Sequence, residues 1–374
     1  MKMLVCGGGT GGHINPAIAV AGFVKSRRPD AEIVFAGASR GMEEKLVPQA
    51  GYELHTVDVS GFKRSFSPSA IVFNVGAAFR MLASRKKAYE IVKNIAPDVV
   101  FGTGGYACFP YVQAAHKLGI PCVLHESNAL PGKAVINAAK YAEKILLGFP
   151  EAKQRLPKEY QEKAIVTGNP IRSGMAVADA EAMKTELGYA GKKLVLSFWG
   201  SLGAREMNKM IADFIALEAE EKPGFVHVHA TGTYGWRWMP ELVAERVNLK
   251  EHPDIDMREY IHNMPQLLAA ADLVICRAGA MTTIELSATG TPAIIVPSPN
   301  VAENHQESNA RALEGRGSAV VVLEKECSGK LLYEKTKELL ADEARLKSMS
   351  KAALDGAILD ADQRIYEELR QYWN

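Results

Sequence analysis

Short runs of apolar and β-branched residues alternate with helical patterns along the chain. In the first half these runs lie at 2–6, 32–37, 53–59, 98–102, 121–126, 144–149 and 164–168. Helical patterns lie between them, for instance at 16–27, 68–94 and 133–142. This alternation predicts parallel strands that are joined by helical crossovers.

The pattern restarts at residue 193. Further apolar runs lie at 193–198, 225–232, 256–260, 272–279, 292–298 and 318–322, with helical patterns at 203–220, 264–271, 280–289, 304–314 and 328–342. The prediction is an α/β protein with two doubly wound, Rossmann-like domains, 1–167 and 168–356, that face each other across a cleft. Glycine and proline in GNPIRSG mark the boundary. Whether the last helix, within 357–374, packs back on the first domain stays open.

Length, net charge, apolar stretches and cysteine spacing exclude several classes of protein. A chain of 374 residues is long for one core and suits two domains. The formal net charge of +1 argues against a bulk nucleic-acid binder, so no nucleic-acid partner is expected. No stretch approaches the roughly 18 apolar residues of a membrane span, and the first apolar run begins at once, which leaves no room for a signal peptide. The five cysteines form no Cys-x-x-Cys pair and are expected to be free thiols.

The first apolar run leads into the glycine turn LVCGGGTGGHINP. Its glycines fit the Gly-x-Gly-x-x-Gly spacing of a dinucleotide-binding turn, which also requires an acidic residue about 20 positions later. The second run ends in AGASRG without an acid, although Ser39 and Arg40 keep a 2′-phosphate, and so NADP, open. The turn lacks the Gly-Lys-Ser/Thr ending of a Walker loop. A dinucleotide is therefore the weaker interpretation of this turn.

Three more glycine turns follow apolar runs: GTGGY, WGSLGA and RAGAMTTIE. Ligands of open α/β sheets bind beyond the carboxyl ends of strands, where such turns lie. RAGAMTTIE is the best anion site, because a bare helix N-terminus meets the hydroxyls of Thr282 and Thr283. Glu285 lies further along and suits ribose hydroxyls. The alternative is an ordinary helix start with a stabilising glutamate.

Several segments occur together in a specific order: GGGTGGHINP, GMEEKLVPQAGYE, PDVVFGTGGY, GIPCVLHESN, GNPIR, GSLGAREMN, CRAGAMTTIEL and HQESNA. In this the chain resembles a bacterial GT-B glycosyltransferase family that transfers N-acetylglucosamine to a lipid-linked muramoyl-pentapeptide. The resemblance spans the chain. It implies a GT-B fold, with the donor UDP-GlcNAc held mainly by the second domain. The polyprenyl-diphosphate-linked acceptor (lipid I) would lie on the first domain, and the product would be lipid II.

The resemblance also implies site residues. The donor set is Thr10, Gly11, Gly12, Asn128, Arg172, Ser201, Ile261, Ala280, Met281, Thr282, Thr283, Ile284, Glu285 and Gln306, and the acceptor side is Gly104, Gly105 and Tyr106. Within the donor set, Glu285 would hold the ribose, the backbone of 280–285 the diphosphate and the Ile261 backbone the uracil edge. Gln306 would bind the transferred sugar. The chain departs from the family's usual residues at Ser127, Trp199, Leu202 and Ala230, which removes polar contacts near the donor.

The family inverts the anomeric centre, which implies one in-line displacement by the 4-hydroxyl of the muramoyl sugar. An imidazole suits proton removal near neutral pH. His13 is the first candidate for the base and Glu126 the second, while a third interpretation makes His13 a positioning donor. The 280–285 helix start would meet the charge on UDP. With no Asp-x-Asp motif in a suitable loop, we expect no tightly bound metal or other cofactor, and only an indirect effect of divalent ions.

Residues 62–93 carry seven Lys or Arg against the single acid Glu90, with apolar residues interleaved. Such a segment is expected to contact an anionic membrane surface, each cation contributing about 1 kcal/mol. The alternative is a crossover helix with a solvated basic face. A lipid-linked acceptor favours membrane contact and a peripheral location on the cytoplasmic face. Transfer to another lipid such as diacylglycerol, sugar-nucleotide epimerisation and a non-catalytic nucleotide-binding module remain alternative functions.

Overall fold

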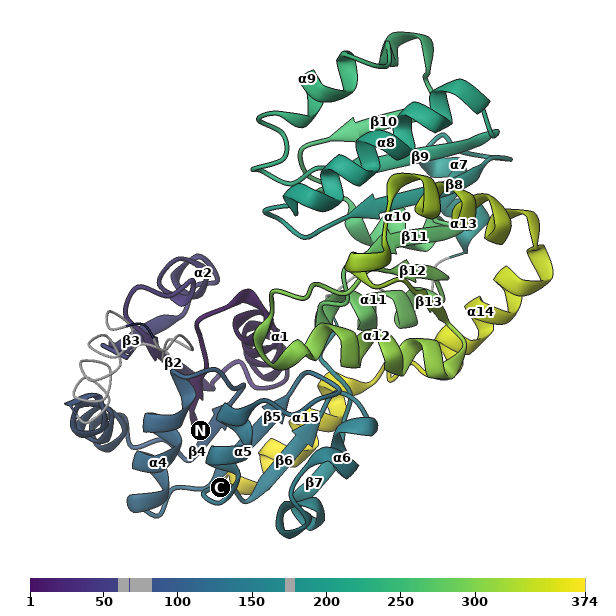
Figure 1. Ribbon diagram of the computed structural model, residues 1–374. Coiled ribbons are helices and arrows are strands. Elements are labelled where there is room, and N and C mark those ends of the chain that lie inside the picture. The colour runs from purple at the N-terminus through teal and green to yellow at the C-terminus, as the bar shows by residue number, and fades with distance from the viewer. Residues whose placement is uncertain (60–66, 68–82, 172–178, 374) are drawn as a thin grey trace. The chain divides into compact units, whose positions relative to one another are not determined.

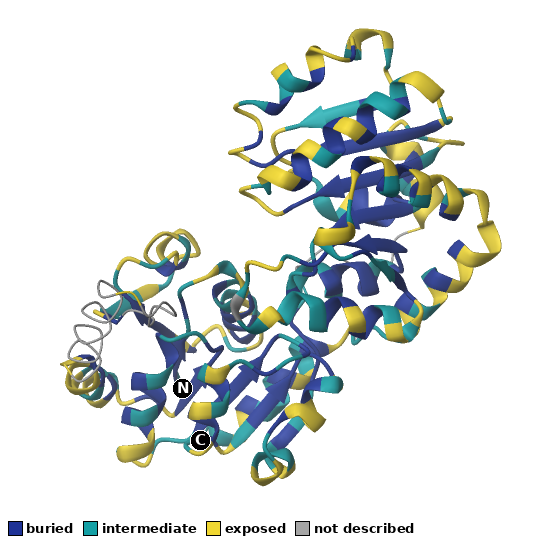
Figure 2. Ribbon diagram, in the orientation of Figure 1, coloured by how far each residue is buried: buried dark blue, intermediate teal, exposed yellow. Residues whose placement is uncertain are grey.

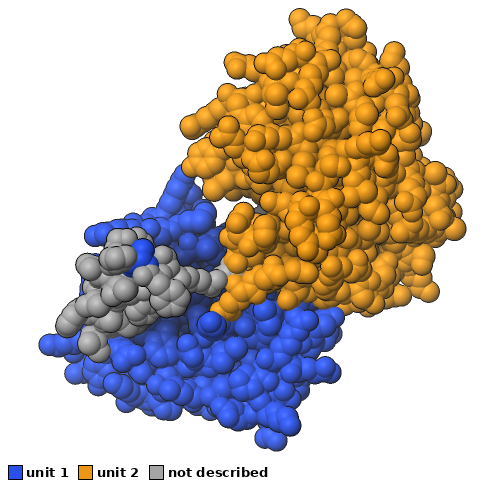
Figure 3. All heavy atoms as spheres, viewed as in Figure 1, with its two compact units in different colours: residues 1–171, 358–374 blue, residues 172–357 orange. Residues whose placement is uncertain are grey.

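The computed structural model describes residues 1–59, 67, 83–171 and 179–373 (Figure 1). The chain divides into two compact units, which Figure 3 shows in different colours. Unit 1 comprises Met1–Ile171 and Ile358–Asn374, and unit 2 comprises Arg172–Ala357. Each unit is built on one parallel sheet, as the alternation of strands and helices predicts. The predicted α/β class with two Rossmann-like units is therefore confirmed.

The sheet of unit 1 has seven strands in the order β3-β2-β1-β4-β5-β6-β7, all parallel. Their bounds are β1 (Lys2–Cys6), β2 (Glu32–Ala38), β3 (Glu53–Val57), β4 (Val99–Gly102), β5 (Cys122–Glu126), β6 (Lys144–Leu147) and β7 (Ala164–Val166). The order reverses between β1 and β4, which makes the carboxyl ends of these two strands the topological switch point. The glycine turns that follow both strands therefore meet at the usual binding position of such a sheet.

Helices cover both faces of this sheet (Figure 1). They are α1 (Gly11–Arg27), α2 (Glu43–Gln49), α4 (Cys108–Lys117), α5 (Lys133–Ala139), α6 (Glu151–Arg155) and α15 (Ala361–Leu369), with short 3-10 turns η1 (Lys158–Lys163) and η5 (Arg370–Tyr372). Residues 83–95 are also helical, whereas the rest of the helix predicted at 68–94 lies outside the described residues.

Alternate residues of β1 enter the two apolar layers of unit 1. Met3 and Val5 pack with α1 and α15, and Leu4 packs with α4 on the other face. Burial on both faces explains why the strand is continuously apolar (Figure 2). The late helix α15 packs against α1, where the rings of Phe23 and Tyr366 meet edge to face at 6.0 Å.

Unit 2 has six parallel strands in the order β10-β9-β8-β11-β12-β13. They are β8 (Lys193–Phe198), β9 (Phe225–Ala230), β10 (Ile255–Arg258), β11 (Leu273–Cys276), β12 (Ala293–Ile295) and β13 (Ala319–Val321). The helices are α7 (Ala180–Glu186), α8 (Arg205–Glu221), α9 (Met239–Ala244), α10 (Met264–Ala270), α11 (Ala280–Thr289), α12 (His305–Arg316), α13 (Gly329–Ala341) and α14 (Glu343–Asp355), with 3-10 turns η2 (Leu249–Glu251), η3 (Ala302–Asn304) and η4 (Glu324–Glu326). The switch point lies between β8 and β11, the strands that WGSLGA and RAGAMTTIE follow.

Candidate active site

In unit 1 the turn between β1 and α1 positions His13. Thr10 precedes the helix in an extended conformation, and within the described residues no side chain caps the start of α1. The imidazole Nδ1 of His13 lies 3.2 Å from the carbonyl oxygen of Gly8 and 3.2 Å from Oγ1 of Thr10. Because a carbonyl oxygen only accepts hydrogen bonds, the contact with Gly8 requires the Nδ1–H tautomer. The lone pair of the neutral ring is then on Nε2, the atom that can take a proton.

The turn after β4 packs against the His13 side chain. Gly104 and Gly105 have φ angles of +91° and +76°, a region that favours glycine. A β-carbon on Gly104 would lie 3.3 Å from Cδ2 of His13, and one on Gly105 would lie 2.3 Å from the carbonyl oxygen of Gly8. Both glycines, which the resemblance assigns to the acceptor side, therefore contact the turn that carries His13.

Tyr106 follows these glycines and lies over the first turn. A β-carbon on Gly9 would approach Cε1 of Tyr106 to 2.8 Å. Burial, and after it the negative charge of Glu43, raise the pKa of Tyr106. The phenol is therefore neutral near pH 7 and can donate or accept a hydrogen bond.

The second candidate base, Glu126, is engaged with the loop that follows β5. It is buried, and its Oε1 accepts hydrogen bonds from the backbone N–H and the side-chain Nδ2 of Asn128, at 2.9 and 3.1 Å. Its Oε2 accepts from the N–H of Gly132 at 2.8 Å, just before α5. Hydrogen bonds from N–H groups stabilise the carboxylate form. This geometry suits a residue that orders the loop and holds Asn128.

His125, the neighbour of Glu126, ties the same loop to the end of unit 1. It is fully buried, and its Nε2 lies 3.2 Å from the carbonyl oxygen of Gly168. Asn169 donates from Nδ2 to the carbonyl oxygen of Ser127 at 2.9 Å. Burial lowers the pKa of His125 from 6.5 to about 4, and the bond to Gly168 opposes this only partly. His125 is therefore neutral and structural at neutral pH.

The buried His125 makes stability depend on pH. The unfolded chain binds a proton near pH 6.5 and the folded chain only near pH 4, so the neutral ring contributes stability above this window. We expect the free energy of unfolding to fall by about 3 kcal/mol on its account as the pH drops through the window. Urea unfolding of the wild type and of His125→Gln at pH 7.5 and 4.5 measures this term. A pH dependence that is equal in the two proteins would contradict it.

In unit 2 the predicted anion site is the start of α11. Gly279 precedes the helix in an extended conformation, and within the described residues no side chain caps it and no acid lies in its first turn. The amides of Ala280, Met281 and Thr282 have no acceptor within the helix and lie at its positive end. Glu285 is buried in the second turn. The start of α11 can thus hold an anion, and the assignment of a nucleotide diphosphate here with its ribose at Glu285 stays a prediction.

Thr283 differs from the prediction. Its side chain is fully buried, and its hydroxyl donates to the carbonyl oxygen of Ala280 at 2.8 Å. The hydroxyl is therefore directed into its own helix, as a threonine in a first turn often is. Thr282 is partly exposed, so it is the threonine of this pair that can present a hydroxyl.

Three further residues of the predicted donor set lie in unit 2: Ser201 after β8, Ile261 after β10 and Gln306 at the start of α12. Ser201 is exposed, and its carbonyl oxygen accepts from the N–H of Thr233 at 3.1 Å, which joins the turns after β8 and β9. Ile261 is buried just after β10, so its side chain belongs to the core while its backbone can serve a ligand. Gln306 accepts at Oε1 from the N–H of Ser298 at 2.9 Å, which fixes its amide beside the loop after β12.

Asn309 is a residue that sequence reasoning missed. It is fully buried on α12, and its Nδ2 donates to the carbonyl oxygen of Ala278 at 3.1 Å. It therefore supports the loop that leads to Gly279 and the start of α11. Its place in the HQESNA motif, three residues after Gln306 on one helix, was the available signal.

Trp199, one of the departures, packs beside the same loop. It is buried, and the guanidinium carbon of Arg277 lies 5.9 Å from the centre of its ring. Arg277 also donates to the carbonyl oxygen of Val296 at 3.0 Å and pairs with Glu324 at 2.5 Å. The tryptophan thus covers an arginine that is held within unit 2.

Two predictions fall on residues outside the described ones: Arg172, and the basic segment at 62–93 up to residue 82 except for Ser67. Among the described residues, no group of three or more His, Cys, Asp or Glu side chains has the arrangement of a metal site. Within the same residues, no helix is long and apolar enough to cross a membrane.

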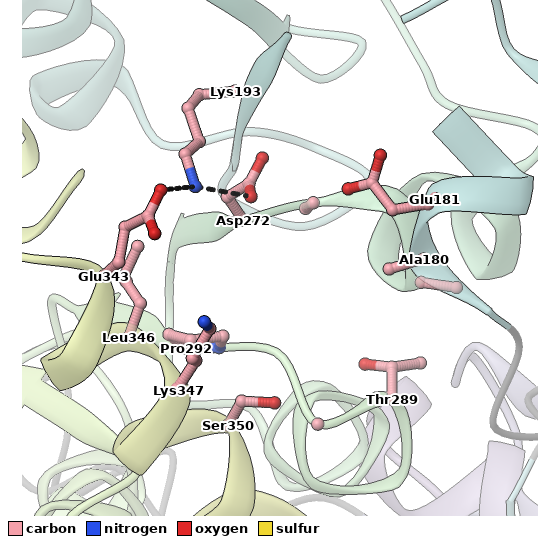
Figure 4. A pocket seen from close by; sticks show the side chains of 13 residues that line it. Ala180, Glu181, Lys193, Asp272, Thr289, Pro292, Glu343, Leu346, Lys347 and Ser350 are labelled. Carbon is pink, nitrogen blue, oxygen red and sulfur yellow. Dashed lines mark ion pairs between the residues drawn. The ribbon is translucent and has the colours of Figure 1, made fainter. Parts of the chain in front are cut away.

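Unit 2 also has a pocket of about 390 Å³ at the opposite edge of its sheet (Figure 4). Lys193 begins β8 there, and its Nζ lies 3.6 Å from carboxylate oxygens of both Asp272 and Glu343. The buried Lys184 lies 2.9 Å from Asp272. These opposite charges neutralise one another at the amino ends of the strands. The pocket is therefore separate from the turns at the carboxyl ends.

Comparison with known proteins gives a consistent result. The model described as "Glycosyltransferase family 28 N-terminal domain" matches residues 3–147, and "Glycosyltransferase family 28 C-terminal domain" matches residues 194–365. A UDP-N-acetylglucosamine–N-acetylmuramyl-(pentapeptide) pyrophosphoryl-undecaprenol N-acetylglucosamine transferase from Acetivibrio thermocellus is 41% identical over 371 residues, which cover 99% of this chain and 98% of that protein.

Two solved structures show how far the fold is shared. The crystal structure of Acinetobacter baumannii MurG has a TM-score of 0.77 at 24% identity and covers 99% of both chains. A UDP-GlcNAc 2-epimerase from Neisseria meningitidis, bound to UDP-GlcNAc, has a TM-score of 0.65 at 16% identity, with 99% of this chain and 100% of that chain covered. The fold is thus common to transferases and epimerases.

Proposed function

The chain belongs to glycosyltransferase family 28, and from this premise we propose that it makes lipid II. It transfers N-acetylglucosamine from UDP-GlcNAc to the 4-hydroxyl of an N-acetylmuramoyl-pentapeptide linked through diphosphate to undecaprenol. The observation that carries this proposal is the full-length likeness to relatives that are named for this reaction. The UDP-GlcNAc 2-epimerase also has this two-unit fold. At 16% identity, however, its likeness to this chain extends to the fold alone.

Unit 2 is proposed to hold the donor. The amides at the start of α11 suit the diphosphate, because they carry partial positive charge at a helix end that no side chain caps within the described residues. Glu285 suits the ribose hydroxyls, since a carboxylate accepts from both. Ser201, Ile261 and Gln306, and Arg172 outside the described residues, are assigned to the donor from the family resemblance.

Unit 1 is proposed to supply the base. Nε2 of His13 takes the proton of the attacking 4-hydroxyl. At the same time the oxygen of this hydroxyl bonds to C1 of the transferred sugar, and the bond between C1 and the UDP oxygen breaks. The first-turn amides of α11 stabilise the charge that develops on UDP. Glu126 acts by holding Asn128, because both of its oxygens accept N–H groups of its own loop. We propose that no tightly bound metal or other cofactor takes part.

The lipid-linked acceptor requires contact with a membrane. We propose that the basic, apolar segment at 62–93 binds the anionic cytoplasmic face of the membrane, so that the protein is peripheral. Cosedimentation with vesicles, with and without anionic lipid, tests this. Binding that does not depend on the anionic lipid would contradict it.

The proposed reaction is tested with radiolabelled UDP-GlcNAc and a short-chain lipid I analogue. We expect labelled disaccharide-lipid and an equal amount of UDP, both dependent on the acceptor. UDP-GlcNAc binding without transfer would reject the lipid II assignment. Release of the C2 epimer without acceptor would favour epimerisation, and transfer to diacylglycerol alone would favour another lipid acceptor.

Replacing Glu285 by glutamine tests the donor site. We expect the KM for UDP-GlcNAc to rise about 10- to 100-fold, because a charge-assisted hydrogen bond to the ribose contributes about 1.5–3 kcal/mol. Initial rates and calorimetric binding of UDP measure the effect. The matched control is Glu334→Gln on the exposed face of α13. A KM equal to that of the control would remove Glu285 from the donor site.

A further inference from the structure

We propose that Glu43 is a positioning residue that acts on His13 through a single peptide group. This inference rests on the proposed function, in which His13 is the base. Glu43 begins α2 and is 1% exposed. Its Oε2 accepts from the N–H of Gly9 at 3.0 Å, and its Oε1 accepts from the N–H of Ala38 at 2.9 Å.

The peptide between Gly8 and Gly9 joins the two side chains. Its N–H, on Gly9, donates to the Glu43 carboxylate, and its carbonyl oxygen, on Gly8, accepts from Nδ1 of His13 at 3.2 Å. The chain of groups is therefore carboxylate, peptide and imidazole. Each hydrogen bond is made to an opposite end of the same peptide dipole.

The surroundings of Glu43 are built around its carboxylate. A β-carbon on Gly8 or on Gly41 would lie 2.1 Å from a carboxylate oxygen, and one on Gly37 would lie 2.8 Å from Cγ of Glu43. The carbonyl oxygen of Gly37 accepts from the hydroxyl of Tyr111 at 2.9 Å. Gly37 within β2, and Gly8 and Gly41 in the turns after β1 and β2, thus leave the space that this one side chain occupies.

This arrangement has a chemical consequence for His13. A carboxylate that accepts the N–H of a peptide polarises it and increases the negative charge on its carbonyl oxygen. The more negative Gly8 oxygen favours Nδ1–H, so the lone pair remains on Nε2, and it stabilises the imidazolium that forms when Nε2 takes the proton. Glu43 itself takes no proton. It does through a peptide what the buried aspartate of a Ser-His-Asp triad does directly.

Replacing Glu43 by glutamine tests the inference. Glutamine is close in size, but it offers one acceptor oxygen to the two N–H groups of Gly9 and Ala38 and carries no charge. The matched control is Glu44→Gln, the exposed neighbour on α2. The readouts are the ¹⁵N shifts of the His13 imidazole in the protein without substrate, and kcat and KM for transfer.

We expect the His13 ring of Glu43→Gln to lose its Nδ1–H preference and kcat to fall about 10- to 100-fold. The KM for UDP-GlcNAc, far-UV circular dichroism and UDP binding should stay near those of Glu44→Gln. An unchanged tautomer would overturn the inference, whether or not kcat falls. Should Glu43→Gln fail to fold, the tautomer is measured in Glu43→Asp, where an undiminished Nδ1–H preference would overturn it equally.

The tautomer measurement is independent of the reaction. If the wild type transfers no sugar to lipid I, the proposed function fails while the ¹⁵N shifts still report on Glu43 and His13. If the wild type is active and the two glutamine variants do not differ, the role of Glu43 fails alone.

Discussion

His13→Gln should lower kcat for transfer by about 10²- to 10⁴-fold, the range for loss of a general base. The amide can hydrogen-bond to the Gly8 carbonyl oxygen but cannot take a proton from a hydroxyl near pH 7. Binding of UDP should be unchanged, because the residues proposed to hold it lie in unit 2. Rates with saturating donor and acceptor, together with calorimetric titration of UDP, measure both quantities.

The control for this variant is His116→Gln, an exposed histidine on α4 of the same unit. It should transfer at the wild-type rate. If His13→Gln keeps kcat within about threefold of this control, His13 is not the base, and Glu126 becomes the leading candidate. A large rise in KM for the donor with little change in kcat would instead favour the third interpretation, in which His13 binds the sugar or phosphate.

Gly105→Ala should lower kcat by at least about 100-fold and reduce the free energy of unfolding by roughly 3 kcal/mol or more, since backbone strain alone costs about 1–3 kcal/mol. The new β-carbon would lie 2.3 Å from the Gly8 oxygen and 3.1 Å from Nδ1 of His13, so the turn has to move. A displacement of about 1 Å at a catalytic group costs about 100-fold in rate. Assays of transfer and urea unfolding give the two effects.

Gly119→Ala separates the clash from the backbone strain. Gly119 has a φ angle of +72°, close to the +76° of Gly105, but a β-carbon there meets nothing within 4 Å. It should lose only about 1–2 kcal/mol of stability and keep its kcat. Equal losses of activity in the two variants would mean that the contact between Gly105 and the Gly8 carbonyl has no part in catalysis.

The alternation of apolar runs and helical patterns was sufficient to predict both sheets. All strands of the described residues coincide with predicted runs, because strands buried on both faces must be continuously apolar. The turns at GGGTGGH and RAGAMTTIE were also predicted to lie at carboxyl ends. Parallel pairing brings such ends to one edge of a sheet, so this step follows from topology alone.

The inward orientation of the Glu43 side chain could not be predicted from the sequence. In GMEEK two glutamates follow each other at a helix start, where acidic residues are common and exposed. Only the folded chain shows that Glu43 is directed inward to Gly9 and Ala38 while Glu44 is exposed. The orientation of the Thr283 hydroxyl and the engagement of Glu126 with its own loop are of the same kind. Each depends on which N–H or C=O lies within 3 Å, which no spacing in the sequence encodes.

The packing of α15 on α1 bears on how the protein is made. Residues 358–373 leave the ribosome after the whole of unit 2. The helix α15 is therefore not available to pack on α1 while residues 172–357 are synthesised. At about 5–20 residues per second that interval is roughly 10–40 s. During it, the apolar side of α1 that Ile365 and Leu369 finally cover is open to solvent or to chaperones. The apolar core of unit 1 is thus completed by a segment that is synthesised only after unit 2.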